Sequence, residues 1–303
     1  MARYNPTEWS AHIFDFKGSM SRQILRHVLV CSAVSVVVYV VNHWVIRIGI
    51  PQVAHTLIGV PLGLLLVFRT NSANDRYWEG RKLWGAILNT SRNFGRGVES
   101  TLAASPHRVA SLLAWTSSFS WATMSHLRKK KDLGPHAVLL PAETVAAVLA
   151  QKHVPLAVCT QISRELVEAR DAHGISEFTR LALEQNIQTL VDQLGGCERI
   201  HSTPLPYPYM VHLRRALLVY CFTLPFALVD YGWAMIPATF LIAYTLFGIE
   251  EIGVEIEDPF DDGFSSIPME DLCTKVSDNL DPLIKQDFAM TASQPIVDKN
   301  TIM

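Results

Sequence analysis

A long apolar run near the start of the chain constrains its fold more than any other feature. The 20 residues His27–Ile46 contain no Lys, Arg, Asp or Glu, and a helix of that length crosses a hydrocarbon layer about 30 Å thick. A buried helix of a large soluble protein is the alternative. The run is rich in valine, which is a weaker helix former in water, so we favour a membrane-spanning helix over 27–46.

Three further apolar runs complete the predicted membrane part. Thr56–Phe68 is too short to span a membrane alone. Its polar continuation can enter the membrane zone only where it faces protein or water, so this helix should lie inside the protein or line a cavity. The last two runs meet at Asp230, and a charge is least costly at an interfacial turn. We expect a helical hairpin there, and the predicted membrane helices after the first are 55–80, 211–229 and 231–249.

Basic residues are distributed unevenly around these runs. The loop after the first run contains only Arg47, and the turn at Asp230 contains no basic residue. The segments on the opposite side carry many more: Arg3, Lys17, Arg22, Arg26, Arg69, Arg76, Arg81, Lys82, Arg214 and Arg215. The positive-inside rule therefore predicts a multi-pass protein with both termini and the long middle in the cytoplasm.

The polar middle of the chain shows apolar residues at helical spacing and no alternation of strands and helices, which predicts an all-helical part. Leu181–Leu194 is one such helix, and Gly195 and Gly196 are expected to end it. We therefore predict an all-α protein of one domain over 1–303. Its cytosolic helical part is expected over 81–210 and 250–281, and its disordered tail over 282–303.

Signatures of catalysis and metal binding are absent from the sequence. It contains no HExxH, GxxxxGK[ST], GxGxxG or GxSxG motif. The 11 histidines are scattered without ligand spacing, and the five cysteines include no CxxC pair. The 26 basic residues nearly balance the 28 acidic ones, so no global field attracts nucleic acid. We predict a protein without enzymatic activity, cofactor, resident metal or nucleic-acid partner.

One face of the second run carries a regular apolar stripe. Val60, Leu64 and Phe68 are four residues apart, and each step rotates by only about 40° around a helix. Gly59 and Gly63 lie beside the stripe and would let neighbouring helices approach closely. Ordinary helix packing explains this pattern. The alternative is that several subunits bring the stripe to a symmetry axis, where stacked apolar rings gate by dewetting.

Charged residues follow both the stripe and the last run. The face of the stripe reaches Asp75 or Arg76 and then Glu79, so a passage there would become polar. The end of the last run holds an acidic cluster, and some of its members should pair with a basic set on the second helix. The acids are Glu250, Glu251, Glu255, Glu257, Asp258, Asp261 and Asp262, and the bases are Arg69, Arg76, Arg81, Arg92 and Arg96.

Four segments of the chain closely resemble the bestrophin family, in its bacterial and plant-thylakoid branch. They are Phe14–Ser19, Phe68–Arg96, Cys197–Arg215 and Ile256–Asp262, and they follow one another in the family's order. The resemblance implies a homopentameric ion channel in a bacterial inner membrane. Each subunit would contribute four transmembrane helices and a helical cytosolic part around one axial pore.

The resemblance also implies roles for particular residues. The family's neck consists of three apolar residues on the second helix, which fall on Val60, Leu64 and Phe68. A second apolar aperture, in the cytosolic part, falls on Leu181, with Phe178 one turn earlier as the alternative. Asp75, Arg76 and Glu79 would then be vestibule charges.

Calcium activation is not expected from the resemblance. Animal members of the family carry a calcium clasp just after the fourth helix. Gly263 and Ser266 stand where carboxylate ligands would be needed, and calcium prefers six to eight oxygen ligands.

Several functions remain open on the sequence. The family implies chloride or another anion as the permeant ion, whereas some bacterial relatives conduct cations such as sodium. An apolar neck carries no charged ring that selects by sign. A membrane scaffold or sensor that binds a soluble partner through the large helical part is the alternative from another class. An alternating-access transporter is disfavoured, because the inverted repeats of many transporters are missing.

Overall fold

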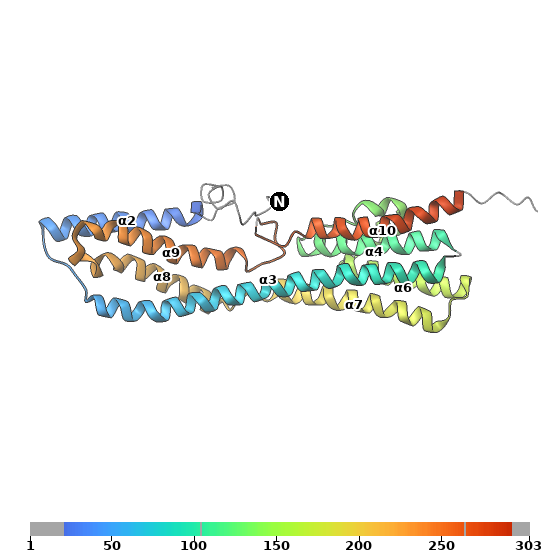
Figure 1. The fold of residues 1–303 in the computed structure, drawn as a ribbon, viewed down its shortest axis with the longest axis horizontal. Helices are drawn as coiled ribbons and strands as arrows, with labels where there is room; N and C mark the ends of the chain where they lie inside the picture. Colours follow the sequence, from blue (N-terminus) through green and yellow to red (C-terminus); the bar gives the residue numbers. More distant parts are fainter. Residues whose placement is uncertain (1–20, 104, 264, 293–303) are drawn as a thin grey trace, which may run out of the picture. The chain divides into compact units, whose positions relative to one another are not determined.

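The computed structural model describes residues 21–103, 105–263 and 265–292, so Phe14–Ser19 lies outside the described residues. Within these ranges the regular structure is entirely helical (Figure 1), as predicted. The chain divides into two compact units. Unit 1 comprises Met1–Trp78, Thr203–Pro259 and Gly263–Ser266, and unit 2 comprises Glu79–Ser202, Phe260–Asp262 and Ile267–Met303.

Unit 1 contains the apolar runs of the sequence. Its helices are α2 (Ser21–Trp44), the first part of α3 (Gln52–Leu102), α8 (Tyr207–Ala227), the short 3-10 helix η2 (Val229–Ala234) and α9 (Met235–Glu255). Figure 1 shows α2 beside α9, and these two helices are in contact. Their buried side chains form one apolar core with α3 and α8, which includes Val28, Leu66, Leu217 and Phe247.

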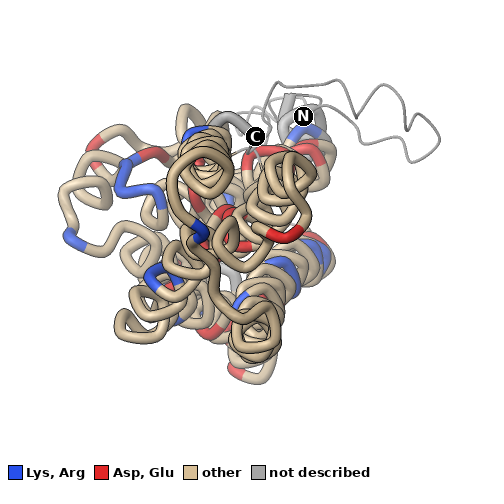
Figure 2. Tube along the Cα trace, turned by 90° about the vertical axis from the view of Figure 1, so that its left-hand side faces the viewer, with Lys and Arg blue, Asp and Glu red and all other residues tan. Residues whose placement is uncertain are grey.

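Three helical stretches are long and apolar enough to cross a membrane, and the second of them begins in unit 1 and ends in unit 2. They lie in Ile24–Trp44, Gln52–Leu102 and Val229–Glu255. Large apolar side chains are exposed on all of them, and in the end-on view of Figure 2 few of the tubes nearest the viewer are coloured as charged. The predicted third span forms helix α8 but is not among the three, because two arginines lie in its first half.

The hairpin between the last two apolar runs is confirmed. α8 ends at Ala227, and η2 turns the chain into α9. Gly232 within the turn has φ 61°, in the region that favours glycine. Asp230 is exposed in this turn.

The second predicted helix is much longer than its predicted limits of 55–80. α3 is one helix of 51 residues that passes through Pro61 and continues to Leu102. The glycines along it do not end it, because several of them fit against other helices. A Cβ at Gly95 would lie 2.6 Å from Leu280, and one at Gly97 would lie 2.9 Å from Leu183. Glycine lowers helix propensity in a sequence, and here close packing against other helices compensates for it.

Unit 2 is built around α4 (Pro106–Leu127), which is buried on nearly all sides. The unit also contains the rest of α3, η1 (Pro135–Leu139), α5 (Ala142–Leu149), α6 (Val154–His173), α7 (Glu177–Ser202) and α10 (Met269–Ala292). α4 packs against α6, α7 and α10, and its pairing with α10 is visible in Figure 1. Trp115 and Phe119 are fully buried on it.

Two predicted helix ends in unit 2 are wrong. α7 does not stop at Gly195 and Gly196 but continues to Ser202, because Gly196 lies against Leu83, 2.7 Å from where its Cβ would be. The predicted disordered tail begins too early, since α10 continues through 282 to Ala292. Leu280 and Ile284 are buried in the core and hold this end of the helix, while 293–303 lie outside the described residues.

A buried carboxylate lies in the core of unit 2. Glu165 on α6 is 5% exposed. Its Oε1 accepts hydrogen bonds from Ser111 Oγ at 3.0 Å and Trp115 Nε1 at 2.9 Å. Arg108 is the nearest cation, 3.9 Å from Oε2. Burial raises the pKa of Glu165 above its ordinary value of 4.5, because desolvation outweighs these favourable contacts.

This pKa shift predicts a pH dependence of stability. A carboxyl whose folded pKa is raised stabilises the fold below its unfolded pKa, and this contribution is lost as the pH rises from about 4.5 through the raised value. Glu165→Gln should therefore be more stable than the wild type at pH 7 by about 1 kcal/mol, and the advantage should vanish in acid. Denaturant unfolding at several pH values measures it. Glu168→Gln, at a mostly exposed carboxylate, is the control that should show no such pattern.

Candidate functional site: an exposed apolar face of α3 and the charges around it

The predicted stripe lies on a face of α3 that points away from the core of its own unit. The exposed fractions of Val60, Leu64 and Phe68 are 69%, 54% and 55%. Leu62 and Leu66, on the opposite face, are 3% and 1% exposed and belong to the core of unit 1. The stripe is therefore free to contact lipid, water or another subunit.

The small residues beside the stripe have different surroundings. A Cβ at Gly59 would lie 2.8 Å from the hydroxyl of Tyr220, so this glycine lets α8 approach α3 closely. The Tyr220 ring packs on His55, with ring centroids 4.1 Å apart. A Cβ at Gly63 would meet no atom of another described element within 4 Å. The predicted close approach is thus confirmed at Gly59 and has no partner at Gly63 within the described chain.

An ion-pair cluster lies directly behind the end of the stripe. Arg69 is fully buried, and its Nη2 lies 3.4 Å from Glu257 Oε2 and 3.7 Å from Glu250 Oε1. Arg214 Nε donates to the same oxygen of Glu250 at 2.8 Å. The backbone N–H of Leu205 donates to Glu257 Oε1 at 3.2 Å. The expected pairing of the acidic cluster with the basic set is therefore realised at Arg69.

The three predicted vestibule charges are not equivalent. Asp75 is exposed. Arg76 donates from Nε to the carbonyl of Glu257 at 2.9 Å and from Nη1 to the carbonyl of Thr203, which ties α3 to the end of α9. Glu79, in unit 2, pairs with Arg199 of α7. Only Asp75 is left with its carboxylate directed to solvent rather than to a described protein partner.

Unit 2 exposes a basic face of α3 and an apolar start of α7. Lys82, Arg92 and Arg96 are exposed, whereas Trp84, Ile87 and Phe94 on the other face of the helix are buried. The predicted aperture residues both lie near the first turn of α7, where Phe178 is 85% exposed and Leu181 is 46% exposed. These side chains, like the stripe in unit 1, point away from their own core.

The stretch after Pro259, where the resemblance places the family's calcium clasp, contains ion pairs. Asp262 lies 2.8 Å from Arg128 Nε and 3.0 Å from Lys130 Nζ. These cations lower the pKa of its carboxyl below the ordinary value, the Lys130 hydrogen bond being the largest cause. Ser266 is buried, with its backbone N–H bonded to the carbonyl of Gly263.

The sequence analysis did not include Arg214 among the bases that pair with the acidic cluster, although it pairs with Glu250. Arg214 and Glu250 lie equally far along the chain from Gly232, on either side of the hairpin turn. Residues so placed meet across two antiparallel helices, which is the signal that would have paired them. The predicted set also included Arg92 and Arg96, which are exposed, whereas Arg69 is fully buried and lies within 4 Å of both Glu250 and Glu257.

Comparison with known proteins identifies related chains. A family model described as bacterial and fungal bestrophin protein matches residues 1–282. A voltage-dependent anion channel-forming protein of Synechocystis sp. is 37% identical over 93% of each chain. A protein of the same description from Nostoc sp. is 35% identical over 91% of each chain. The protein YneE of Escherichia coli, also described as voltage-dependent anion channel-forming, is 29% identical over 96% of each chain.

Solved structures show the same fold. A crystal structure of a bacterial bestrophin homologue from Klebsiella pneumoniae, carrying one substitution, has a TM-score of 0.81 and 28% identity. The match covers 86% of this chain and 98% of the other. A second variant from the same organism has a TM-score of 0.82 and 27% identity, covering 87% and 100%.

Proposed function

Because this chain belongs to the bestrophin family, we propose that it is a passive anion channel rather than an enzyme. Relatives that are 37% and 35% identical over the aligned residues are described as voltage-dependent anion channel-forming proteins, and the sequence carries no catalytic motif. The observation that carries the proposal is the exposed apolar face of α3 at Val60, Leu64 and Phe68. This face has no counterpart within the described part of its own subunit to bury it.

The neck of the channel is formed by these three side chains from several subunits. Water leaves a narrow apolar constriction, and ions then face a barrier without any charged gate. The open space beside Gly63 supports close approach of a neighbouring helix at this level. Five copies around one axis is the assembly we propose, with Leu181 or Phe178 of α7 as a second apolar constriction.

Anion selectivity is supported by the charges that are left exposed. Lys82, Arg92 and Arg96 are exposed on α3 in unit 2, whereas Glu79 is neutralised by Arg199. A surface with exposed basic side chains concentrates anions near it. The exposed carboxylate of Asp75 favours the second candidate, a monovalent-cation channel of the same fold.

The membrane orientation follows from the loops. Between α2 and α3 the only basic residue is Arg47, and η2 contains none. We therefore place these connections outside and both termini, with unit 2, in the cytoplasm of a bacterial cell, with four helices of unit 1 in the inner membrane. Calcium does not activate the channel in this proposal, because Asp262 already binds Arg128 and Lys130.

The experiment is a current measurement on purified protein in planar bilayers with a tenfold gradient of KCl. An anion-selective channel reverses close to the chloride equilibrium potential, whereas a cation channel reverses at the opposite sign. The same currents recorded with calcium and with a chelator should be equal. Protein that carries no current above empty bilayers would favour the scaffold or sensor and contradict the channel.

A further inference from the structure

Three metal-ligating side chains that are far apart in the sequence meet in unit 2. His126 lies at the end of α4, His153 caps the start of α6, and Glu198 lies on α7. Both histidine Nε2 atoms lie 2.8 Å from Glu198 Oε1, and one ligand atom from each residue falls within 4.8 Å of the others. The channel function uses none of these groups.

The cluster has the composition of a site for a borderline-soft divalent cation. Imidazole nitrogen and carboxylate oxygen bind Zn²⁺ at about 2.0–2.2 Å. Tetrahedral coordination places ligand atoms about 3.3 Å apart, so His126 and His153 need to move only slightly from their hydrogen-bonded positions around Glu198. Calcium is a poor fit, because it requires six to eight oxygen ligands.

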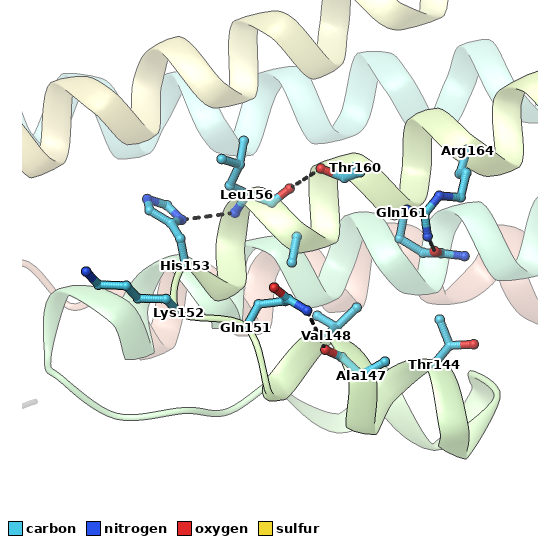
Figure 3. A pocket seen from close by; sticks show the side chains of 11 residues that line it. Thr144, Ala147, Val148, Gln151, Lys152, His153, Leu156, Thr160, Gln161 and Arg164 are labelled. Atoms are coloured by element: carbon cyan, nitrogen blue, oxygen red, sulfur yellow. Dashed lines mark hydrogen bonds between the residues drawn. The ribbon is translucent and has the colours of Figure 1, made fainter.

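The side chains are also accessible. Their exposed fractions are 31% for His126, 37% for His153 and 34% for Glu198. His153 in addition lines a cavity of about 470 Å³ between α5 and α6, together with Leu156 and Gln151. Figure 3 shows the His153 ring at one end of this cavity. Solvent can therefore carry an ion to the cluster and supply a further ligand.

The hydrogen bonds define what an ion would displace. His153 Nδ1 accepts a 3.3 Å hydrogen bond from the backbone N–H of Leu156 (Figure 3), which assigns the proton of the neutral ring to Nε2. Metal binding at Nε2 moves that proton to Nδ1 and breaks this bond to α6. The loss lowers the affinity, so the ion is exchangeable rather than a permanent part of the fold.

We propose that His126, His153 and Glu198 bind one exchangeable Zn²⁺ ion per subunit, with water as the fourth ligand. Closed structural zinc sites have four protein ligands, whereas three leave a position open. The ion joins α4, α6 and α7 at one point. The site thereby connects zinc concentration to the helix that carries Phe178 and Leu181.

The experiment uses the purified, metal-stripped full chain in detergent, titrated with Zn²⁺ in competition with a chromophoric chelator. We expect one equivalent per subunit to bind. His126→Gln, Glu198→Gln and His153→Asn should each weaken binding by more than about tenfold, since even outer partners of zinc ligands contribute that much. Asparagine at 153 keeps an acceptor for the start of α6 while removing the imidazole.

His107→Gln is the matched control, because His107 is an exposed histidine of the same unit and should leave binding unchanged. Strong visible absorption of Co²⁺ bound in place of Zn²⁺ reports a four-coordinate site in the wild type, independently of how any variant folds. Excess Ca²⁺ should not displace Zn²⁺. Failure of the wild type to bind one equivalent, or wild-type affinity in any folded variant of the three, would overturn the site.

Discussion

Channels carrying Phe68→Ala will pass about ten times more current than the wild type at the same voltage. The Phe68 side chain is 55% exposed, at the polar end of the apolar stripe. In the proposed assembly, its truncation in every subunit widens the neck and allows water to remain there. A tenfold increase corresponds to a barrier lower by about 1.4 kcal/mol. Single-channel recording separates a larger conductance from a higher open probability.

Leu241→Ala supplies the matched control for this experiment. Leu241 is a large apolar residue of α9 with 63% exposure, but it is not part of the stripe. Its truncation should leave the current unchanged. Equal currents in wild type and Phe68→Ala would remove Phe68 from the neck, and an increase in both variants would show a general loosening of the membrane part.

Arg69→Met is expected to destabilise the protein by about 3–5 kcal/mol, because removing one partner leaves buried charges uncompensated. Glu250 and Glu257 have side chains only 9% and 14% exposed and both lie within 4 Å of the Arg69 guanidinium. Methionine fills part of the space but supplies no charge. Thermal unfolding in detergent, followed by tryptophan fluorescence, should show a midpoint lower by about 10 °C.

Two further variants test the origin of this loss. Arg214 also pairs with Glu250 but is 55% exposed, so Arg214→Gln should cost no more than about 1 kcal/mol. The double variant Arg69→Met/Glu257→Gln should recover part of the stability, because it removes one of the stranded carboxylates. An unfolding midpoint for Arg69→Met equal to that of the wild type would contradict a structural part for this cluster.

The long-range arrangement of charges could not be read from spacing. The acidic cluster after the last run and the arginines of α3 predicted pairing of some kind, yet only the folded chain selects Arg69 for Glu250 and Glu257. Burial determines which arginine pairs with these acids, because the pairing depends on which side of α3 faces the core. The convergence of His126, His153 and Glu198 from three helices was invisible for the same reason.

The ends of the helices were also decided by contacts between distant segments rather than by local sequence. Gly195 and Gly196 predicted the end of a helix and 282–303 a disordered tail, but α7 continues to Ser202 and α10 to Ala292. A glycine near the end of a periodic segment lowers local helix propensity, and a neighbour such as Leu83 that packs closely against it restores the balance. Local sequence does not contain that neighbour, so local reasoning ended the helices too early.

The amino-acid order alone determined the all-helical architecture, the hairpin at Asp230 and the apolar stripe on α3. Hydrophobic periodicity is a property of a single helix, so it can be read from consecutive residues. Only the tertiary structure decided which side of α3 is buried, leaving Val60, Leu64 and Phe68 exposed, and which charges neutralise one another. Those outcomes depend on contacts between segments far apart in the chain, and desolvation on forming them selects the partner of each charge.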